Sequence, residues 1–269
     1  MKAAIAVITI GDASRDLWLS TFMPSVRLYA DRCGYDLHHF TSLIDHETTR
    51  HPSWQKLLLA GHSDLAGYDR IVYLDHDILI SPLAPPIAEC VSGPRIGAVT
   101  WAGSYNDDPI ARSVIETTWR WNNAKWLRDL NPQCFADLLV AAGYPPTEDH
   151  CNTGVFVFSP QHAEVFREVY EHGLSNERTS LEQAALTNCL CNTHKHLVHA
   201  LDRRFNAIWD FEKIAYYSFL DQLYPTSTII MHCIEATLAR VWFLHFAGGG
   251  MQREWARNYV SQSHLRSNA

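Results

Sequence analysis

Two aspartates interrupt an apolar stretch of the chain. Residues 71–80 read IVYLDHDILI, so Asp75 and Asp77 directly follow a run typical of a strand buried on both faces. A buried carboxylate is costly unless a positive charge compensates it. Two carboxylates at the end of a core strand therefore indicate a bound cation or a cationic ligand. The alternative is an acidic pair that caps a following turn or helix.

Composition excludes two broad classes of partner. The chain has 269 residues, 47% of them hydrophobic, and a formal net charge of −7. An acidic chain lacks the basic surface that binds a phosphate backbone, so no nucleic-acid partner is expected. No run of 18 apolar residues is present, so no transmembrane segment is expected. A phosphate-bearing ligand would then need a metal to supply positive charge.

The sequence favours a cytoplasmic protein. The apolar run at 3–10 leads into Gly11 without a clear cleavage site, which indicates a first strand and not a signal peptide. The seven cysteines are odd in number and include no C-x-x-C pair. They are expected to be reduced thiols.

Apolar runs alternate with helix signals along the chain. Strands are expected at 3–10, 36–41, 71–74, 96–101, 151–158, 196–200, 228–233 and 240–246. Helices are expected at 14–34 with an interruption at Pro24, and at 52–62, 107–143, 160–173, from 179, and 252–265. This order predicts an α/β fold: one domain over 1–269 with a mixed, mostly parallel central sheet flanked by helices. Ligands of such sheets bind at the carboxyl ends of the strands.

Five segments resemble one enzyme family in their order. They are YDRIVYLDHDILI (68–80), CNTGVFVFSP (151–160), LEQAALTN (181–188), RFNAIWDF (204–211) and FLHFAGG (243–249). Together they resemble nucleotide-sugar-dependent glycosyltransferases of the GT-A fold, most of all the retaining glycogenin and lipopolysaccharide-galactosyltransferase-like family. The resemblance implies a Rossmann-like domain with a nucleotide-binding half at about 1–105 and a half for donor sugar and acceptor at about 106–269. A shared fold does not by itself establish the chemistry.

The resemblance implies a metal site. In that family the D-x-D aspartates and a histidine from a C-terminal H-x-x-G loop hold a divalent cation, and the matching residues are Asp75, Asp77 and His245. A metal stabilises the charge that develops on a diphosphate leaving group. Carboxylate and imidazole ligands suit Mn²⁺, with Mg²⁺ as the alternative. His76 is either a metal or ribose contact or, if the segment is extended, a packing residue that points away from the aspartates.

Three further positions match residues that contact the donor sugar in the family. Asn152 opens the N-T-G that replaces the family's N-[AS]-G. Glu182 and Gln183 replace a D-Q pair, so both are expected to be catalytic, with Gln183 facing the anomeric carbon. Glu182 in place of aspartate is a departure that affects donor preference. Both residues also fit capping boxes with residues 179 and 180.

The expected nucleotide contacts leave weaker marks in the sequence. Lys56 lies where the family has a basic residue on the helix before the D-x-D strand. It contacts the diphosphate or the donor sugar, or else it lies on a solvated helix face. Thr9, Ile10 and Gly11 end the first strand, where the family places the base and ribose.

The C-terminal loop departs from the family's H-x-x-G-x-x-K-P-W. Gly248 is in place, but Met251 stands where the family has a lysine on the diphosphate. Arg253 lies two residues further on, and we expect it to replace that lysine as the phosphate clamp.

These residues lead to one expected activity and three alternatives. The expected activity is metal-dependent transfer of a hexose from a UDP-sugar to a saccharide or other hydroxyl acceptor, with retention implied by the family. The alternatives are an inverting transferase with Asp149 or Asp210 as base, a metal-dependent sugar nucleotidyltransferase, and a non-catalytic sugar-binding module. The tryptophan-rich segment 119–126 either stacks on acceptor sugars or packs in the core.

Overall fold

The computed structural model describes residues 1–124, 137–147, 149–174, 181–222, 226–248 and 250–266. Its strands are β1 (Ala3–Ile8), β2 (Asp36–Phe40), β3 (Arg70–Leu74), β4 (Ile78–Ile80), β5 (Ile96–Thr100), β6 (Cys151–Phe158), β7 (Val198–Ala200), β8 (Ala207–Ile208) and β9 (Phe243–His245). Its α-helices are α1 (Asp12–Leu17), α2 (Met23–Cys33), α3 (Pro109–Ala124), α4 (Asp137–Ala141), α5 (Ala163–His172), α6 (Gln183–Asn188), α7 (Trp209–Tyr216), α8 (Phe219–Gln222), α9 (Ser227–Leu238) and α10 (Gly250–Arg266).

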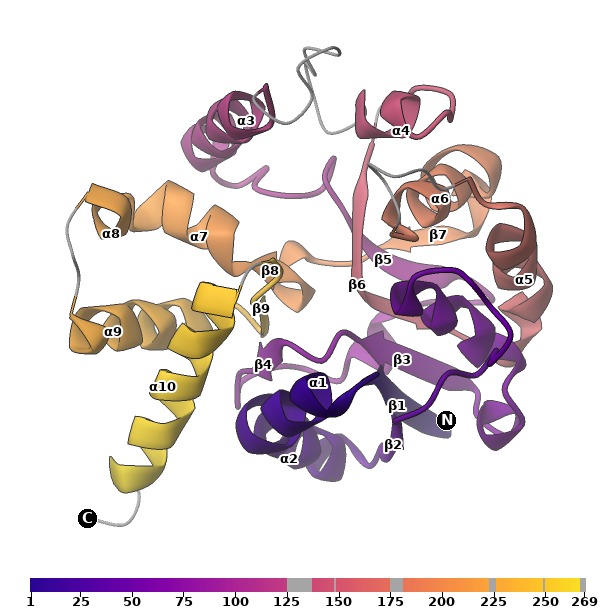
Figure 1. Cartoon of the computed structure of the whole chain (residues 1–269), viewed down its shortest axis with the longest axis horizontal. Helices are drawn as coiled ribbons and strands as arrows, with labels where there is room; N and C mark the ends of the chain where they lie inside the picture. Colours follow the sequence, from indigo (N-terminus) through magenta and orange to yellow (C-terminus); the bar gives the residue numbers. More distant parts are fainter. Residues whose placement is uncertain (125–136, 148, 175–180, 223–225, 249, 267–269) are drawn as a thin grey trace.

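A six-stranded sheet of order β2-β1-β3-β6-β5-β7 forms the centre of the molecule (Figure 1). Its neighbours pair in parallel except around β6, which is antiparallel to both β3 and β5. The predicted α/β class with a mixed, mostly parallel sheet is therefore confirmed. Because β1 and β3 are parallel, their carboxyl ends lie at the same edge of the sheet.

Successive residues of the central strands face two separate cores. Ile5, Val72 and Val157 belong to one core, which α2, α7 and α9 complete. Ala6, Tyr73 and Phe156 belong to the other, covered by the segment Pro52–Gly61 and by α5 and α6. A strand buried on both faces has no polar alternation, which explains the continuous apolar runs in the sequence. Each large side chain that is fully buried stabilises the fold by roughly 1.5–3 kcal/mol.

A small sheet of order β4-β9-β8 lies beside the large one. Strand β4 is antiparallel to β9, and β8 is parallel to it. The chain passes from β3 in the large sheet to β4 in the small one through residues 75–77, which form a turn. This turn therefore joins the two sheets.

Several local predictions are corrected by the structure. Residues 228–233, predicted as a strand, belong to helix α9, because Ile230, Ile234 and Thr237 recur at helical spacing and bury one face. The predicted strand 240–246 is only the short β9. The segment Pro52–Gly61, predicted as a helix, is a 3₁₀-helix. The interruption expected at Pro24 is present as a π-helical turn at Trp18–Phe22, just before that proline. The tryptophan-rich segment 119–126 lies outside the residues whose side chains are described.

Two further expectations concern cysteines and membranes. The six cysteines within the described ranges (33, 90, 151, 189, 191 and 233) are free thiols, as predicted. Over those same ranges, no helix combines the length and apolar character needed to cross a membrane.

Candidate active site

A cavity of about 480 Å³ opens at the carboxyl ends of β1 and β3. All of the residues predicted for the site line it except Thr9 and Gly11. Thr9 is buried, and its hydroxyl lies 2.7 Å from Nε2 of His39, whereas Ile10 reaches the cavity. The fold therefore brings together residues that lie as much as 243 positions apart, from Ile10 to Arg253.

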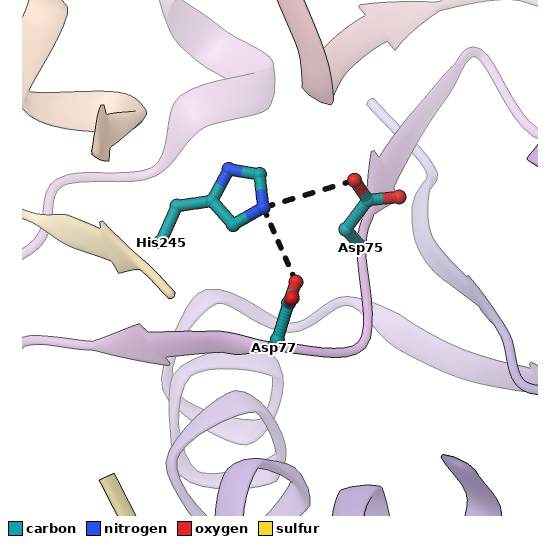
Figure 2. A group of neighbouring side chains, drawn as sticks. All are labelled: Asp75, Asp77 and His245. Atoms are coloured by element: carbon teal, nitrogen blue, oxygen red, sulfur yellow. Dashed lines mark ion pairs between the residues drawn. The ribbon is translucent and has the colours of Figure 1, made fainter. Parts of the chain in front are cut away.

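The three predicted metal ligands converge at the junction of the two sheets. Asp75 follows β3, Asp77 precedes β4, and His245 ends β9, whose register places it opposite Ile78. Nε2 of His245 lies 3.2 Å from Oδ1 of Asp77 and 3.8 Å from Oδ2 of Asp75. Figure 2 shows the three side chains pointing toward one another from these separate segments. One ligand atom from each lies within 4.8 Å of the others.

This cluster fits a divalent cation. Oδ1 of Asp77 is buried and has no hydrogen-bond partner among the described residues, an arrangement that a cation would satisfy. Burial opposes ionisation of both aspartates. The facing His245, when its ring is positively charged, and Arg253 nevertheless hold the pKa of Asp77 well below its usual range, and Lys56 does most to lower the pKa of Asp75. Both carboxylates are therefore ionised at neutral pH, as metal ligands must be.

Lys56 is a buried counter-charge and does not lie on a solvated helix face. Its Nζ lies 3.0 Å from Oδ1 of Asp75 and 2.8 Å from Oε1 of Glu182, and it donates to the carbonyl of Thr153 at 3.1 Å. Burial works against its charge, but the two carboxylates more than offset that effect and raise its pKa above the ordinary value. Glu182 also accepts a hydrogen bond from the Thr153 hydroxyl at 2.7 Å. This network fixes one face of the cavity.

Arg253 points into the cavity, whereas Met251 is exposed. Nη2 and Nε of Arg253 donate to Oδ2 of Asp77 at 2.8 and 3.0 Å, while Met251 is 65% exposed. The fold thus brings the guanidinium of Arg253, and not the side chain of Met251, to the aspartates. Gly248, whose φ of 106° suits glycine, lets the intervening loop turn beside the site.

His76 lines the same cavity as the two aspartates. An extended segment would place His76 on the side away from the aspartates, but residues 76 and 77 form a turn, so strand alternation does not apply. Burial lowers the pKa of His76, and its Nε2 has no hydrogen-bond partner within the described part of the chain.

A second cavity, of about 250 Å³, adjoins the first. Asn152, Gln183, Ala247 and Gly248 line both. Its walls include Trp101, whose ring centroid lies 6.1 Å from that of Tyr105 and 5.8 Å from that of Phe211. Aromatic walls with a few polar groups at one end are typical of sites that bind a sugar ring.

Gln183 lies at the opening between the cavities and is held by His150. Nε2 of Gln183 lies 3.1 Å from Nε2 of His150, and burial lowers the pKa of His150 to about 4. His150 is therefore neutral near pH 7 and accepts this hydrogen bond from the amide. The side chain of Glu182 is thus bound by Lys56 and Thr153, and that of Gln183 by His150. Residues 179 and 180, expected to form capping boxes with them, lie outside the described residues.

The two acidic residues considered as bases for an inverting reaction do not line either cavity. Oδ1 of Asp149 accepts from the backbone amides of Ala102 and His150 at 2.7 and 2.8 Å. Asp210 pairs with Lys213 at 3.4 Å. Neither residue is placed to take a proton from a ligand in these cavities.

Two residues that contact His245 were not predicted from the sequence. Asn206 is buried and its Oδ1 lies 2.9 Å from Nδ1 of His245. Gly154 lies against the same imidazole. Both lie inside segments that matched the family, but a lone asparagine before a strand and a glycine within one carry no chemical signal of their own.

The comparisons with known proteins agree with this geometry. No protein-family model and no curated protein matches the chain. A solved glycosyltransferase involved in glycosylation of the major capsid of PBCV-1 matches at a TM-score of 0.56 and 14% identity, over 97% of this chain and 100% of that one. The chain has a GT-A-like fold.

Two other solved structures extend the likeness. The galactosyltransferase LgtC, crystallised with donor and acceptor sugar analogs, matches at a TM-score of 0.51 and 14% identity over 96% of this chain and 95% of that one. The apo structure of the bifunctional glycosyltransferase WbbM matches at 0.51 and 11% identity over 99% of this chain but 51% of that one. The GT-A-like fold confirms the resemblance that the five segments indicated. At these identities the likeness establishes the fold, and the chemistry must be argued from the site.

Proposed function

We propose that this chain is a metal-dependent glycosyltransferase that moves a hexose from a UDP-sugar to a saccharide or other hydroxyl acceptor with retention. The observation that carries the proposal is the meeting of two cavities at Gln183 and Asn152. One holds the cluster of Asp75, Asp77 and His245, and the other has aromatic walls. A transferase needs such a junction, because the donor carbon and the acceptor oxygen must come within bonding reach.

The first cavity suits a nucleoside diphosphate sugar. Asp75, Asp77 and His245 would hold Mn²⁺ or Mg²⁺, which when bound supplies positive charge to the diphosphate leaving group. Arg253 adds a second positive charge at the same edge of the cavity. Ile10, at the end of β1, lies on the side expected for the base and ribose, within the proposed nucleotide-binding half.

The second cavity suits the acceptor. It adjoins the first through Gln183, and its aromatic walls and volume of about 250 Å³ favour a single sugar ring packed against Trp101 and Phe211. Within the described part of the chain no carboxylate lines it. The acceptor hydroxyl proton then goes to the departing diphosphate as the bond from the anomeric carbon to the phosphate oxygen breaks and the new glycosidic bond forms. The absence of a carboxylate base there favours retention.

Gln183 and Glu182 have different proposed roles. Gln183, an uncharged amide held by His150, positions the donor's anomeric carbon toward the acceptor without taking a proton. Glu182 is fixed by Lys56 and Thr153 and shapes the subsite for the donor hydroxyls, so its extra methylene relative to aspartate affects donor choice. Asn152 lies between the two cavities, within reach of the donor sugar.

The direct test is a panel of nucleotide sugars assayed for metal-dependent release of the nucleotide. We expect UDP release from a UDP-hexose with Mn²⁺, loss of release with a chelator, and loss in Asp77→Asn, while the exposed Asp64→Asn serves as the matched control. UDP with Mn²⁺ should also raise the melting temperature, and ATP and NAD should not. Equal stabilisation by ATP and UDP would support a nucleotidyltransferase, and binding of UDP-sugar without turnover on any acceptor would support a binding module.

A further inference from the structure

We propose that Asn206 is a positioning residue that sets the tautomer of His245, so that the unprotonated Nε2 faces the two aspartates. The inference rests on the proposed metal-dependent function and concerns a residue outside the expected ligand set. It follows from a chain of hydrogen bonds whose direction is set by a backbone amide.

The chain of hydrogen bonds begins at Gly154. Its backbone N–H donates to the side chain of Asn152 at 2.9 Å. A backbone N–H can only donate, so the atom of Asn152 that it meets must be the carbonyl oxygen Oδ1. This contact settles the orientation of the Asn152 amide.

The orientation of Asn206 follows from that of Asn152. The amide of Asn206 lies 3.0 Å from Oδ1 of Asn152 and 3.2 Å from the backbone carbonyl of the same residue. Both of these atoms are acceptors, so the atom that Asn206 presents to them is its donor, Nδ2. The other end of the amide, Oδ1, then faces Nδ1 of His245 at 2.9 Å.

An amide oxygen accepts only, so Nδ1 of His245 carries the proton. In the neutral imidazole Nε2 is then a lone pair, directed at Oδ1 of Asp77 at 3.2 Å and Oδ2 of Asp75 at 3.8 Å. Nε2 of His245 and the two carboxylate oxygens then carry lone pairs and no proton, so all three can coordinate a cation. Histidine ligands are oriented by a hydrogen bond on the opposite ring nitrogen, as Nδ1 has here. Asn206 and His245 are 4% and 2% exposed, so solvent competes little with this bond.

The small sheet positions Asn206 beside His245. Asn206 directly precedes β8, and β8 pairs in parallel with β9 so that Ile208 lies opposite His245. The same short sheet therefore carries Asp77, His245 and the residue that orients His245. A shift of register in it would separate all three.

The tautomer can be measured in the unaltered protein. Long-range ¹H–¹⁵N NMR of the histidine rings with saturating Mg²⁺, with the His245 signal assigned from its loss in His245→Gln, should show a proton on Nδ1 of His245 and none on Nε2. A proton on Nε2, or an unprotonated Nδ1, would overturn the inference.

Metal affinity supplies the second measurement. Titration of Mn²⁺ without nucleotide, followed by the electron paramagnetic resonance signal of free Mn²⁺, should show affinity about 10–100-fold weaker in Asn206→Ala than in the unaltered protein. Asn192→Ala, which removes an asparagine bonded to Asn188 and outside both cavities, should leave it unchanged. If Asp77→Asn abolishes Mn²⁺ binding but a folded Asn206→Ala does not weaken it, the inference about Asn206 is wrong and the proposed metal site stands. If Asp77→Asn also binds normally, the metal site itself is wrong.

Discussion

The imidazole of His245 lies directly against the backbone of Gly154. A β-carbon at position 154 would come within 2.7 Å of Nδ1 of His245 and closer still to Cε1, well inside van der Waals contact. The φ of Gly154 is not positive, so glycine is required here by space and not by backbone conformation. This glycine therefore belongs to the proposed metal site although it offers no ligand.

Gly154→Ala should displace His245 from the aspartates. We expect Mn²⁺ affinity to fall at least about tenfold, as for the loss of other groups that orient a metal ligand, with a loss of stability of about 1–3 kcal/mol from overpacking. Gly67→Ala is the matched control, because a β-carbon there meets nothing within 4 Å. Unchanged Mn²⁺ affinity in Gly154→Ala, measured by the same titration, would show that His245 is not a ligand.

Arg253 should bind the diphosphate and not the nucleoside. Because a charge-assisted hydrogen bond contributes about 1.5–3 kcal/mol, Arg253→Gln should weaken UDP binding at saturating Mn²⁺ by about tenfold or more and leave uridine binding unchanged. Calorimetric titration of both ligands checks this, with the exposed Arg257→Gln as control. Equal losses for UDP and uridine would assign Arg253 to the shape of the cavity and not to phosphate binding.

Lys56 should be a large contributor to stability. Its Nζ lies between two carboxylates, and removing one partner of a buried ion pair costs about 3–5 kcal/mol. Lys56→Met should lower the free energy of unfolding in urea by about that amount, and adding Glu182→Gln should restore part of it because one uncompensated charge is removed. The exposed Lys195→Met should have no effect. If Lys56→Met changes the free energy of unfolding as little as Lys195→Met does, the network is not formed in solution.

Gln183 should matter for turnover more than for binding. In Gln183→Ala we expect most of kcat to be lost while UDP affinity and melting temperature change little, because the side chain lies at the opening between the cavities. A parallel fall in UDP affinity and melting temperature would instead assign a structural role to this side chain at the start of α6.

His150 should make stability depend on pH below about 6.5. Its pKa is about 4 in the folded protein because of burial, and about 6.5 when unfolded, so the unfolded chain binds the extra proton over that interval. The free energy of unfolding is therefore unaffected by His150 above about pH 6.5 and decreases as the pH drops toward 4. At pH 5 the decrease is roughly 2 kcal/mol. Urea denaturation at pH 5 and pH 7 should show a smaller difference for His150→Gln. The same pH difference in both proteins would refute the assignment.

The sequence by itself determined the local features of this protein. Continuous apolar runs predicted the strands of a sheet covered on both faces, because such strands have no solvent side. The interruption of one run by Asp75 and Asp77 predicted a bound cation or a cationic ligand, because buried carboxylates need compensation. At 228–233 a strand was expected, but the residues belong to α9, whose burial follows the helical period.

Only the tertiary structure decided which distant groups meet. Asp75 follows a strand of the large sheet and Asp77 precedes a strand of the small one. His245 joins them because β4 pairs with β9 in a register that places His245 opposite Ile78. The burial of Lys56 between Asp75 and Glu182, and the hydrogen bond from His245 to Asn206, likewise depend on packing between elements. Local pattern depends on the residues next to a position, whereas these contacts depend on strand register and on how elements pack, which no short stretch of sequence contains.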